Sequence, residues 1–140
     1  MNRALVAGAA ALASAAACLV FAPAASAAPA APAACVTQSL TTGPQGGVGT
    51  IRTKSATSTC GDLNLTYSDD STSTLGDRYA GRLRNSSGVW STCSKGYVWA
   101  SDGSHSVNDS TYWLCTDVRD NTPFTVASYY DGGDSVQITH

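Results

Sequence analysis

Four cysteines are the residues of this chain best suited to chemistry, and their spacing favours disulfide bonds over a catalytic or metal site. The fifth cysteine, Cys18, lies in an apolar N-terminal segment. None of the other four forms a C-x-x-C pair, the spacing used by zinc sites and thiol redox motifs. Four cysteines allow three pairings. We expect Cys35 to pair with Cys60 and Cys93 with Cys115, because each link closes a loop of about 25 residues and joins neighbouring strands.

Histidine and aspartate supply few catalytic candidates. His105 lies in a polar turn and His140 is the last residue, and no G-x-S-x-G motif accompanies them. The carboxylates that could act as a glycosidase pair are Asp69, Asp70, Asp102 and Asp117. Aspartate also commonly caps turns and loops, which accounts for all four positions. We therefore assign no catalytic residue, and a small extracellular hydrolase is kept only as an alternative function.

One segment resembles a known calcium motif. Residues 69–74 (DDSTST) resemble the acidic-then-hydroxyl calcium signature of βγ-crystallin domains. Tyr79-Ala80-Gly81 and Tyr130-Asp131-Gly132 are similar to the aromatic-x-Gly corners of that family. The order and spacing of these pieces depart from the family's pattern. We therefore expect no metal ligand and no cofactor.

Aromatic side chains are the strongest candidates for ligand binding. An exposed tryptophan or tyrosine can stack on the flat face of a sugar ring, while carboxylates and amides bond its hydroxyls. The residues assigned to such a platform are Trp99, Trp113, Tyr112, Tyr129 and Tyr130. The alternative is that these rings fill the core, because the chain is short of large aliphatic residues. Their exposure in the folded domain distinguishes the two roles.

The first 27 residues predict an export signal. A start containing Arg3 precedes an alanine-rich apolar run, and Ala25-Ser26-Ala27 supplies the small residues of a cleavage site. We place cleavage after Ala27, with Ala30 as the alternative. Residues 28–34 then form a flexible Ala/Pro-rich tail, and residues 35–140 form one disulfide-stapled domain. The prediction is a secreted, extracellular protein with no membrane segment after cleavage.

The rest of the composition excludes several partners. The formal net charge is −2 and the basic residues are scattered, so we expect no nucleic-acid-binding surface. All 10 acidic residues are aspartate, and serine and threonine exceed a quarter of the mature chain. Asp, Ser and Thr side chains compete for backbone hydrogen bonds, which disfavours helices. We expect an all-β protein that is a monomer.

The elements that must position these residues have the pattern of short strands. Leu63, Leu65 and Tyr67 alternate with polar residues, which predicts a strand whose apolar set faces the core. Further predicted strands, bounded by turn residues, cover 79–84, 89–93, 97–100, 124–130 and 135–139, with 36–40 and 48–53 as two additional candidates. Residues 111–118 are apolar on both faces and predict a central strand. A total of seven or eight strands indicates a single antiparallel β-sandwich or small β-barrel.

The leader and the alanine-rich, glutamate-free, Ser/Thr-rich composition resemble small exported proteins of actinobacteria, without pointing to a named family. We expect a non-catalytic extracellular binding module with cell-wall or environmental polysaccharide as its ligand. One alternative is a secreted inhibitor that binds a protease or another extracellular protein through the loop 43–49 or 102–109. The other alternative is the hydrolase considered above.

Overall fold

The computed structural model describes residues 34–57, 59–107 and 109–140. The predicted signal peptide (1–27) lies outside the described residues, as does all of the predicted tail except Ala34. The fold is that of the second of two units into which the chain divides, Ala31–His140.

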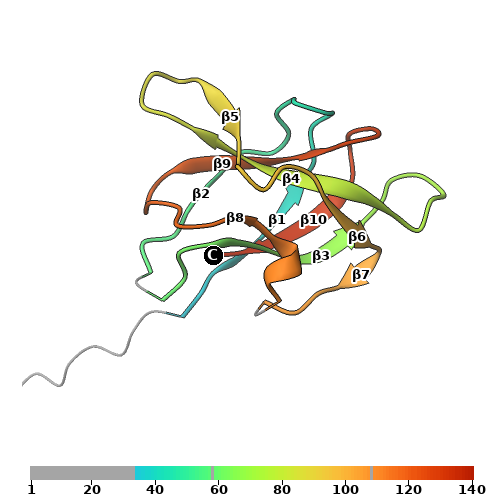
Figure 1. Ribbon diagram of the computed structural model, residues 1–140, viewed down its shortest axis with the longest axis horizontal. Coiled ribbons are helices and arrows are strands. Elements are labelled where there is room, and N and C mark those ends of the chain that lie inside the picture. The colour runs from blue at the N-terminus through green and yellow to red at the C-terminus, as the bar shows by residue number, and fades with distance from the viewer. Residues whose placement is uncertain (1–33, 58, 108) are drawn as a thin grey trace, which may run out of the picture. The chain divides into compact units, whose positions relative to one another are not determined.

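Ten short strands form two antiparallel sheets in the described part of the chain (Figure 1). Sheet A has the order β1 (Thr37–Thr41), β10 (Ser135–Thr139), β3 (Leu63–Asp69), and the other edge of β3 pairs with both β7 (Gly103–Ser104) and β8 (Trp113–Cys115). Sheet B has the order β2 (Arg52–Thr53), β9 (Pro123–Ser128), β4 (Gly76–Arg84), and the other edge of β4 pairs with both β5 (Trp90–Thr92) and β6 (Val98–Ser101). The predicted all-β fold is confirmed, in the form of a two-sheet sandwich.

The core lies between the two sheets. Its buried side chains include Leu40, Leu63, Leu65, Val136 and Ile138 from sheet A and Tyr79, Val98, Phe124 and Val126 from sheet B. Tyr79 and Phe124 are the aromatic rings of this cluster among the described residues. Aliphatic side chains therefore supply most of the core, which leaves several other aromatic rings at the surface.

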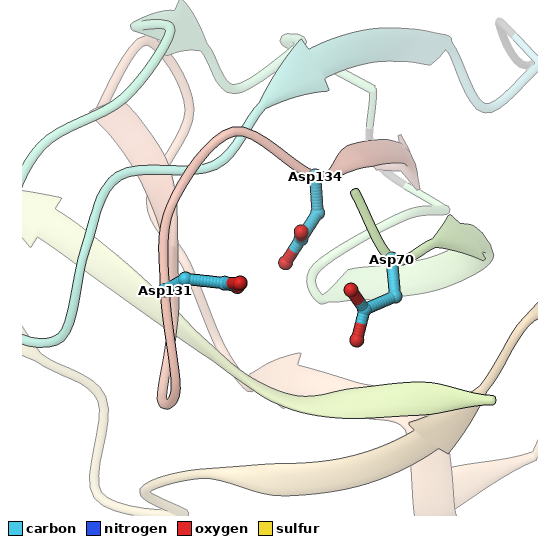
Figure 2. Close-up of side chains that lie close together, drawn as sticks. All are labelled: Asp70, Asp131 and Asp134. Atoms are coloured by element: carbon cyan, nitrogen blue, oxygen red, sulfur yellow. The ribbon is translucent and has the colours of Figure 1, made fainter. Parts of the chain in front are cut away.

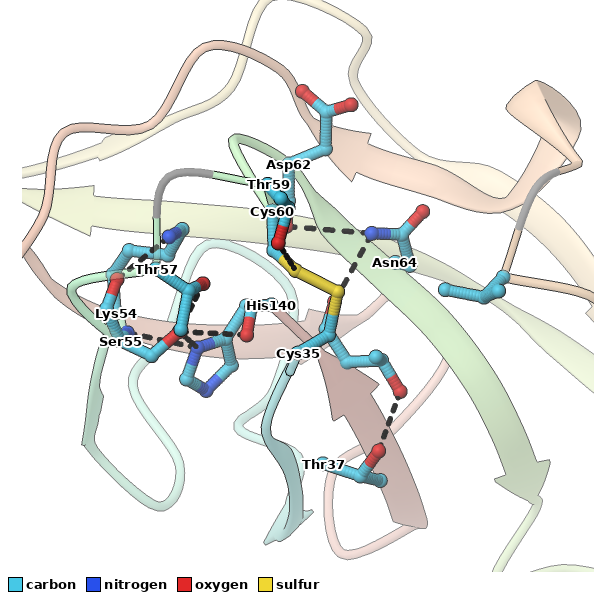
Figure 3. Close-up of a disulfide and its surroundings, with 12 residues drawn as sticks. Cys35, Thr37, Lys54, Ser55, Thr57, Thr59, Cys60, Asp62, Asn64 and His140 are labelled. Carbon is cyan, nitrogen blue, oxygen red and sulfur yellow. Dashed lines mark hydrogen bonds between the residues drawn. A yellow bond between two sulfur atoms is a disulfide. The ribbon is translucent and has the colours of Figure 1, made fainter. Parts of the chain in front are cut away.

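Both predicted disulfides are confirmed, Cys35–Cys60 and Cys93–Cys115. Cys93 follows β5 of sheet B and Cys115 ends β8 of sheet A, so this bond joins the two sheets. Cys35 and Cys60 precede β1 and β3, so the other bond ties together two segments that enter sheet A (Figure 3). Disulfides persist in oxidising environments, and the pair indicates an extracellular or similar compartment.

A β-bulge in β3 changes which side chains face the core. Between their paired positions at Leu65 and Tyr67, β3 has one more residue than β10, so Thr66 is the extra residue. An extra residue reverses the alternation of side chains beyond it. The prediction that Tyr67 faces the core is therefore wrong: Tyr67 is half-exposed and Ser68 is fully buried. The same reversal leaves Asp70, just after the strand, buried.

The predicted central strand 111–118 is wrong in extent and in place. Ser110–Tyr112 form a 3-10 turn whose N-cap, Asp109, accepts a hydrogen bond from the Thr111 N–H. β8 covers three residues and lies at an edge of sheet A, and Asp117, with a φ of 53°, follows it in the left-handed region. The segment is apolar on both faces because Leu114 and Cys115 enter the core beside the half-buried rings that precede them. Among the described residues no helix is long and apolar enough to cross a membrane.

Other boundaries also differ from the prediction. β4 begins at Gly76, three residues early, and Gly103–Ser104 form β7 where a turn was predicted. The predicted strand 48–53 is reduced to Arg52–Thr53. β9 ends at Ser128, so the two following tyrosines are not on opposite faces of a strand but in a surface bend.

His140 is buried in the fold although it is the last residue. Its Nδ1 accepts a hydrogen bond from the Ser55 N–H at 2.9 Å, and its Nε2 lies 3.3 Å from Gln38 Oε1. The ring lies edge to face against Phe124, with 5.1 Å between centroids. Burial lowers the pKa of His140, and the Lys54 ammonium lowers this pKa further (Figure 3). The fold therefore stabilises the neutral form of this imidazole.

We expect the free energy of unfolding to fall as the pH is lowered from about 7.5 to about 5.5, on either side of the usual histidine pKa of about 6.5. The folded pKa lies below the unfolded one, so the unfolded state binds more protons in this window and stability is lost on acidification. His105 contributes in the same direction, because burial lowers its pKa more than Asp109 raises it. Urea unfolding at a series of pH values measures the slope. His140→Gln and His105→Gln should each flatten it, and an unchanged slope in both variants contradicts the assignment.

Candidate functional site

Three of the five predicted ligand-binding aromatics are exposed, Trp99 on β6 of sheet B and Tyr129 and Tyr130 in the bend that follows β9. Trp99 is 51% exposed, Tyr129 40% and Tyr130 66%. Trp99 of β6 pairs with Arg78 of β4, and Tyr129 donates its N–H to the Arg78 carbonyl from the opposite side of β4. The backbones at Trp99 and Tyr129 therefore lie on opposite sides of Arg78, and the distance between them is two strand spacings, about 10 Å.

Trp99 and Arg78 lie on the outer face of sheet B. Paired residues of antiparallel strands project to the same side, and successive residues alternate. Val98 and Tyr79, the neighbours of Trp99 and Arg78 along their strands, are both buried in the core. Trp99 and Arg78 consequently face solvent together.

Tyr97 extends this surface and is held in place by the loop 43–49. The Tyr97 ring centroid lies 5.3 Å from that of Tyr129, which lies 5.2 Å from that of Tyr130, both edge to face. The Tyr97 hydroxyl accepts a hydrogen bond from the Gly46 N–H at 2.8 Å. The guanidinium of Arg82 donates to the carbonyls of Gly46 and Gly47 and secures the same loop. We call Tyr97, Trp99, Tyr129 and Tyr130, together with Arg78, the aromatic face.

The other two predicted aromatics lie elsewhere. Tyr112 is half-buried and stacks on His105 with 4.1 Å between ring centroids. Trp113 belongs to β8 of sheet A, and its Nε1–H donates to the Val107 carbonyl at 3.2 Å. It lines a small pocket that also includes the Cys35–Cys60 disulfide. The structure therefore brings three of the five residues together and separates two from them.

His105 meets a serine, but in an arrangement that does not fit nucleophilic catalysis. Its Nε2 lies 2.9 Å from the Oγ of Ser68, which is fully buried. The Ser68 hydroxyl donates its one hydrogen to the Ser101 carbonyl at 3.0 Å, so Nε2 must be the donor in the contact with Ser68. A general base would instead accept the proton of the serine hydroxyl. The pair therefore acts as a structural hydrogen bond behind β7.

A cluster of three carboxylates lies at the end of the sandwich next to the aromatic face. Asp70, Asp131 and Asp134 each place a carboxylate oxygen within 4.8 Å of the other two (Figure 2). Asp70 follows β3, and the other two residues belong to the turn between β9 and β10. We call these three residues the acidic cluster. No metal ligand is predicted from the sequence, where Asp70 appears both among the candidate catalytic carboxylates and in the segment 69–74 that resembles a calcium motif.

The turn that carries two of these residues requires its glycines. Gly133 has a φ of +106°, a conformation that other residues adopt only with strain. A Cβ on Gly132 would lie 2.8 Å from the backbone nitrogen of Pro44. Asp134 is anchored on both sides, because its N–H donates to Thr42 Oγ1 at 3.0 Å and its Oδ1 accepts from the Ser71 N–H at 2.9 Å.

The pKa values of two members of the acidic cluster are shifted in opposite directions. Burial opposes ionisation of Asp70, but hydrogen bonds from Thr74 and Thr72 outweigh it, and the pKa of Asp70 is lowered. The Thr72 and Thr74 hydroxyls of the segment that resembles a βγ-crystallin motif thus donate hydrogen bonds to Asp70. The pKa of Asp131 is raised, first by burial and then by the charges of Asp134 and Asp70.

Buried polar atoms without a hydrogen-bond partner are found at this end of the sandwich. Asp134 Oδ2 and Asp131 Oδ1 have none, and neither does the hydroxyl of the fully buried Tyr79. Burial raises the pKa of Tyr79, and the charges of Asp134, Asp77 and Asp70 add to the effect. Unpaired buried polar atoms typically cost about 1 to 3 kcal/mol each, so their presence in one region requires a reason.

The sequence contains the acidic residues of this cluster in recognisable positions, but it does not show that they lie together. Asp69-Asp70 and Asp131-Gly-Gly-Asp134 each follow a predicted strand. Only the pairing of β3 with β10 brings the end of one strand to the start of the other. The bulge at Thr66 then selects Asp70, rather than Asp69, as the buried member of the pair.

Comparison of this chain with protein family models, with curated proteins and with solved structures finds no match. The aromatic face and the acidic cluster are therefore the features of the molecule that bear on its function.

Proposed function

We propose that this protein is a secreted, non-catalytic carbohydrate-binding module that holds polysaccharide on its aromatic face. The observation that carries the proposal is the placement of Trp99 and Tyr129, both substantially exposed, on the two sides of Arg78 on one sheet face. Trp99 alone leaves half of its surface in water. Burying such a ring against a ligand is a large source of binding free energy.

The chemistry of this face suits a sugar chain. Aromatic rings stack on the apolar C–H faces of pyranose rings, and a guanidinium between them donates hydrogen bonds to hydroxyls. The backbones that carry Trp99 and Tyr129 lie two strand separations apart, about 10 Å, which is long enough for the two residues to contact successive sugar units rather than one. An open sheet face also accommodates an extended chain better than a small free sugar, which binding sites usually enclose.

The compartment is consistent with such a ligand. Two disulfides indicate an oxidising environment, and the predicted leader 1–27 supplies export. Cell-wall or environmental polysaccharides are encountered there. Ser68 is fully buried and its hydroxyl donates to the Ser101 carbonyl rather than to His105, which favours binding over hydrolysis.

Trp99→Ala should weaken retention on an insoluble glycan at least tenfold. Truncation of a central interface tryptophan typically costs about 2 kcal/mol or more, and tenfold corresponds to about 1.4 kcal/mol. The measurement is a depletion isotherm on peptidoglycan, chitin and cellulose, combined with the shift in tryptophan emission on soluble oligomers. Because Trp99 is exposed, the variant should keep the thermal unfolding midpoint of the wild type.

Val89→Ala is the matched control, because Val89 is 56% exposed and lies before β5, away from the aromatic face. It removes exposed apolar surface without touching the rings, and retention should be unchanged. If the wild-type protein is not retained on any of the three glycans, or if both variants lose retention equally, the proposal is wrong.

A further inference from the structure

The acidic cluster has the composition and dimensions of a site for a hard divalent cation. Calcium takes oxygen ligands at about 2.3 to 2.6 Å, so two ligand atoms on one ion lie at most about 5 Å apart. The three carboxylate oxygens of Asp70, Asp131 and Asp134 lie within 4.8 Å of one another, inside this limit. No histidine or cysteine belongs to this group of described residues, which disfavours zinc and copper.

Within the described part of the chain, no basic side chain forms an ion pair with these carboxylates. The ion pair found among the described residues is Lys54–Asp120, and it involves none of the three. Like charges at such short range repel, more strongly where burial reduces the effective dielectric constant. Asp70 accepts hydrogen bonds from the Thr72 N–H and from the Thr72 and Thr74 hydroxyls, none of which carries a positive charge. A bound cation would supply the missing positive charge.

An unpartnered and fully buried oxygen provides an independent indication. Asp134 is 0% exposed, and its Oδ2 has no hydrogen-bond partner. Figure 2 shows its carboxylate directed into the space between Asp70 and Asp131. Asp131 Oδ1 is likewise buried and without a partner.

We propose that Asp70, Asp131 and Asp134 bind a calcium ion that joins the turn between β9 and β10 to the end of β3. The carboxylate oxygens of Asp134 and Asp131 that lack a hydrogen-bond partner point at the position that the ion would take. Calcium fits better than magnesium, which requires nearly ideal octahedral geometry at about 2.0 to 2.1 Å and retains several waters. The remaining ligand positions would be filled by water at the side of Asp131, which is only partly buried.

The ion would also hold part of the aromatic face. Asp131 directly follows Tyr129 and Tyr130, so a ligand bond to its carboxylate fixes the backbone that carries both rings. This consequence rests on the proposed carbohydrate function, whereas calcium binding does not.

Calcium titration of the full mature domain, without glycan, tests the site. At about 10 mM CaCl2, which is tenfold above the weakest affinity usual for extracellular calcium modules, the unfolding temperature should rise by about 5 °C or more relative to EDTA-treated protein. Terbium, used as a luminescent calcium probe, should show tyrosine-sensitised emission that calcium displaces. Magnesium at the same concentration should give a smaller shift. No calcium-dependent shift and no terbium emission, or an equal response to magnesium, overturns the proposal.

Asp134→Asn and Asp131→Asn should each abolish the calcium-dependent shift. Asp134→Asn keeps an oxygen to accept from Ser71 N–H, and Asp131→Asn changes a residue that is only partly buried, so at least one variant should remain folded by circular dichroism. Asp69→Asn is the matched control, because it removes the same charge one residue before Asp70 from an exposed side chain. A calcium response lost in Asp69→Asn as well, or kept in both cluster variants, contradicts the assignment.

The two proposals fail separately. If the protein binds calcium but is not retained on any glycan, the cation site is supported and the proposed carbohydrate function is wrong. If glycan is retained, EDTA should weaken retention, and retention that is equal with calcium and with EDTA overturns the coupling between the ion and the two tyrosines.

Discussion

Replacing Cys93 and Cys115 together by alanine is expected to lower the free energy of unfolding by about 3.5 kcal/mol. The bond closes a loop of 22 residues, and in the chain-entropy model a loop of this length is worth roughly 3 to 3.5 kcal/mol. Cys115 is 3% exposed and packs in the core, so loss of its sulfur adds a packing cost. Small domains are typically stable by about 5 to 15 kcal/mol, so this change removes a large share of the total. Urea unfolding of the variant against the wild type measures it.

The second disulfide is the matched comparison for this result. Cys35–Cys60 closes a similar loop, with a separation of 25 residues, but Cys35 is exposed and the bond ties segments of sheet A only. Replacing Cys35 and Cys60 together by alanine should therefore lower the free energy of unfolding by a similar loop-closure contribution, with a smaller contribution from lost packing. A loss below about 1 kcal/mol for the Cys93–Cys115 pair, or a larger loss for Cys35–Cys60, contradicts this account.

Gly81→Ala should destabilise the domain by about 3 kcal/mol, the upper part of the usual range for overpacked cores. A Cβ at Gly81 would lie 2.3 Å from Cys115 Sγ and 3.2 Å from Leu114 Cβ. The sulfur cannot move aside easily, because it is bonded to Cys93 across the two sheets. β4 must therefore shift, or the disulfide must distort. Chemical unfolding of the variant measures the cost.

Gly61→Ala is the control for this substitution, because a Cβ there would meet nothing within 4 Å. Its effect should stay within about 0.5 kcal/mol, as for most surface changes. The Gly81→Ala penalty should also shrink in the background that lacks Cys93 and Cys115, since the obstructing sulfur is gone. Additive losses in that double-mutant cycle would show that the steric explanation is incorrect.

The turn between β9 and β10 links the two parts of the proposed site. It begins with Tyr129 and Tyr130 of the aromatic face and ends with Asp131 and Asp134 of the acidic cluster. Its position is fixed by Asp134, whose backbone N–H and Oδ1 bond to Thr42 and to the Ser71 N–H. Binding of an ion or a substitution in the acidic cluster is therefore expected to change the positions of the two tyrosine rings, because at most five or six residues of backbone separate them.

Local patterns in the sequence were sufficient for the fold class and for the covalent links. Short apolar alternations separated by Gly, Asn and Ser turns predict strands, and the absence of glutamate disfavours helices. The pairing of Cys35 with Cys60 and of Cys93 with Cys115 followed from loop length. Each of these properties depends on residues close together in the chain, which is why a sequence can reveal them.

The faces of individual strands depended on contacts that no local pattern contains. The bulge at Thr66 arises from the register between β3 and β10, and it buries Ser68 and Asp70 in place of Tyr67. The predicted strand 111–118 shortened because the N-cap at Asp109 stabilises a 3-10 turn that competes with extended structure. Alternation in sequence identifies a strand, but one inserted residue reverses its two sides.

Local patterns in the sequence are enough to predict an all-β domain with two disulfides and a short set of aromatic residues as ligand candidates. Only the tertiary structure showed that Trp99, Tyr129 and Tyr130 share one exposed face while Tyr112 and Trp113 do not. It likewise brought Asp70 to Asp131 and Asp134, which lie more than half of the domain away in sequence. Both outcomes depend on which strands pair and in which register, and strand pairing is a long-range property set by the packing of the whole core.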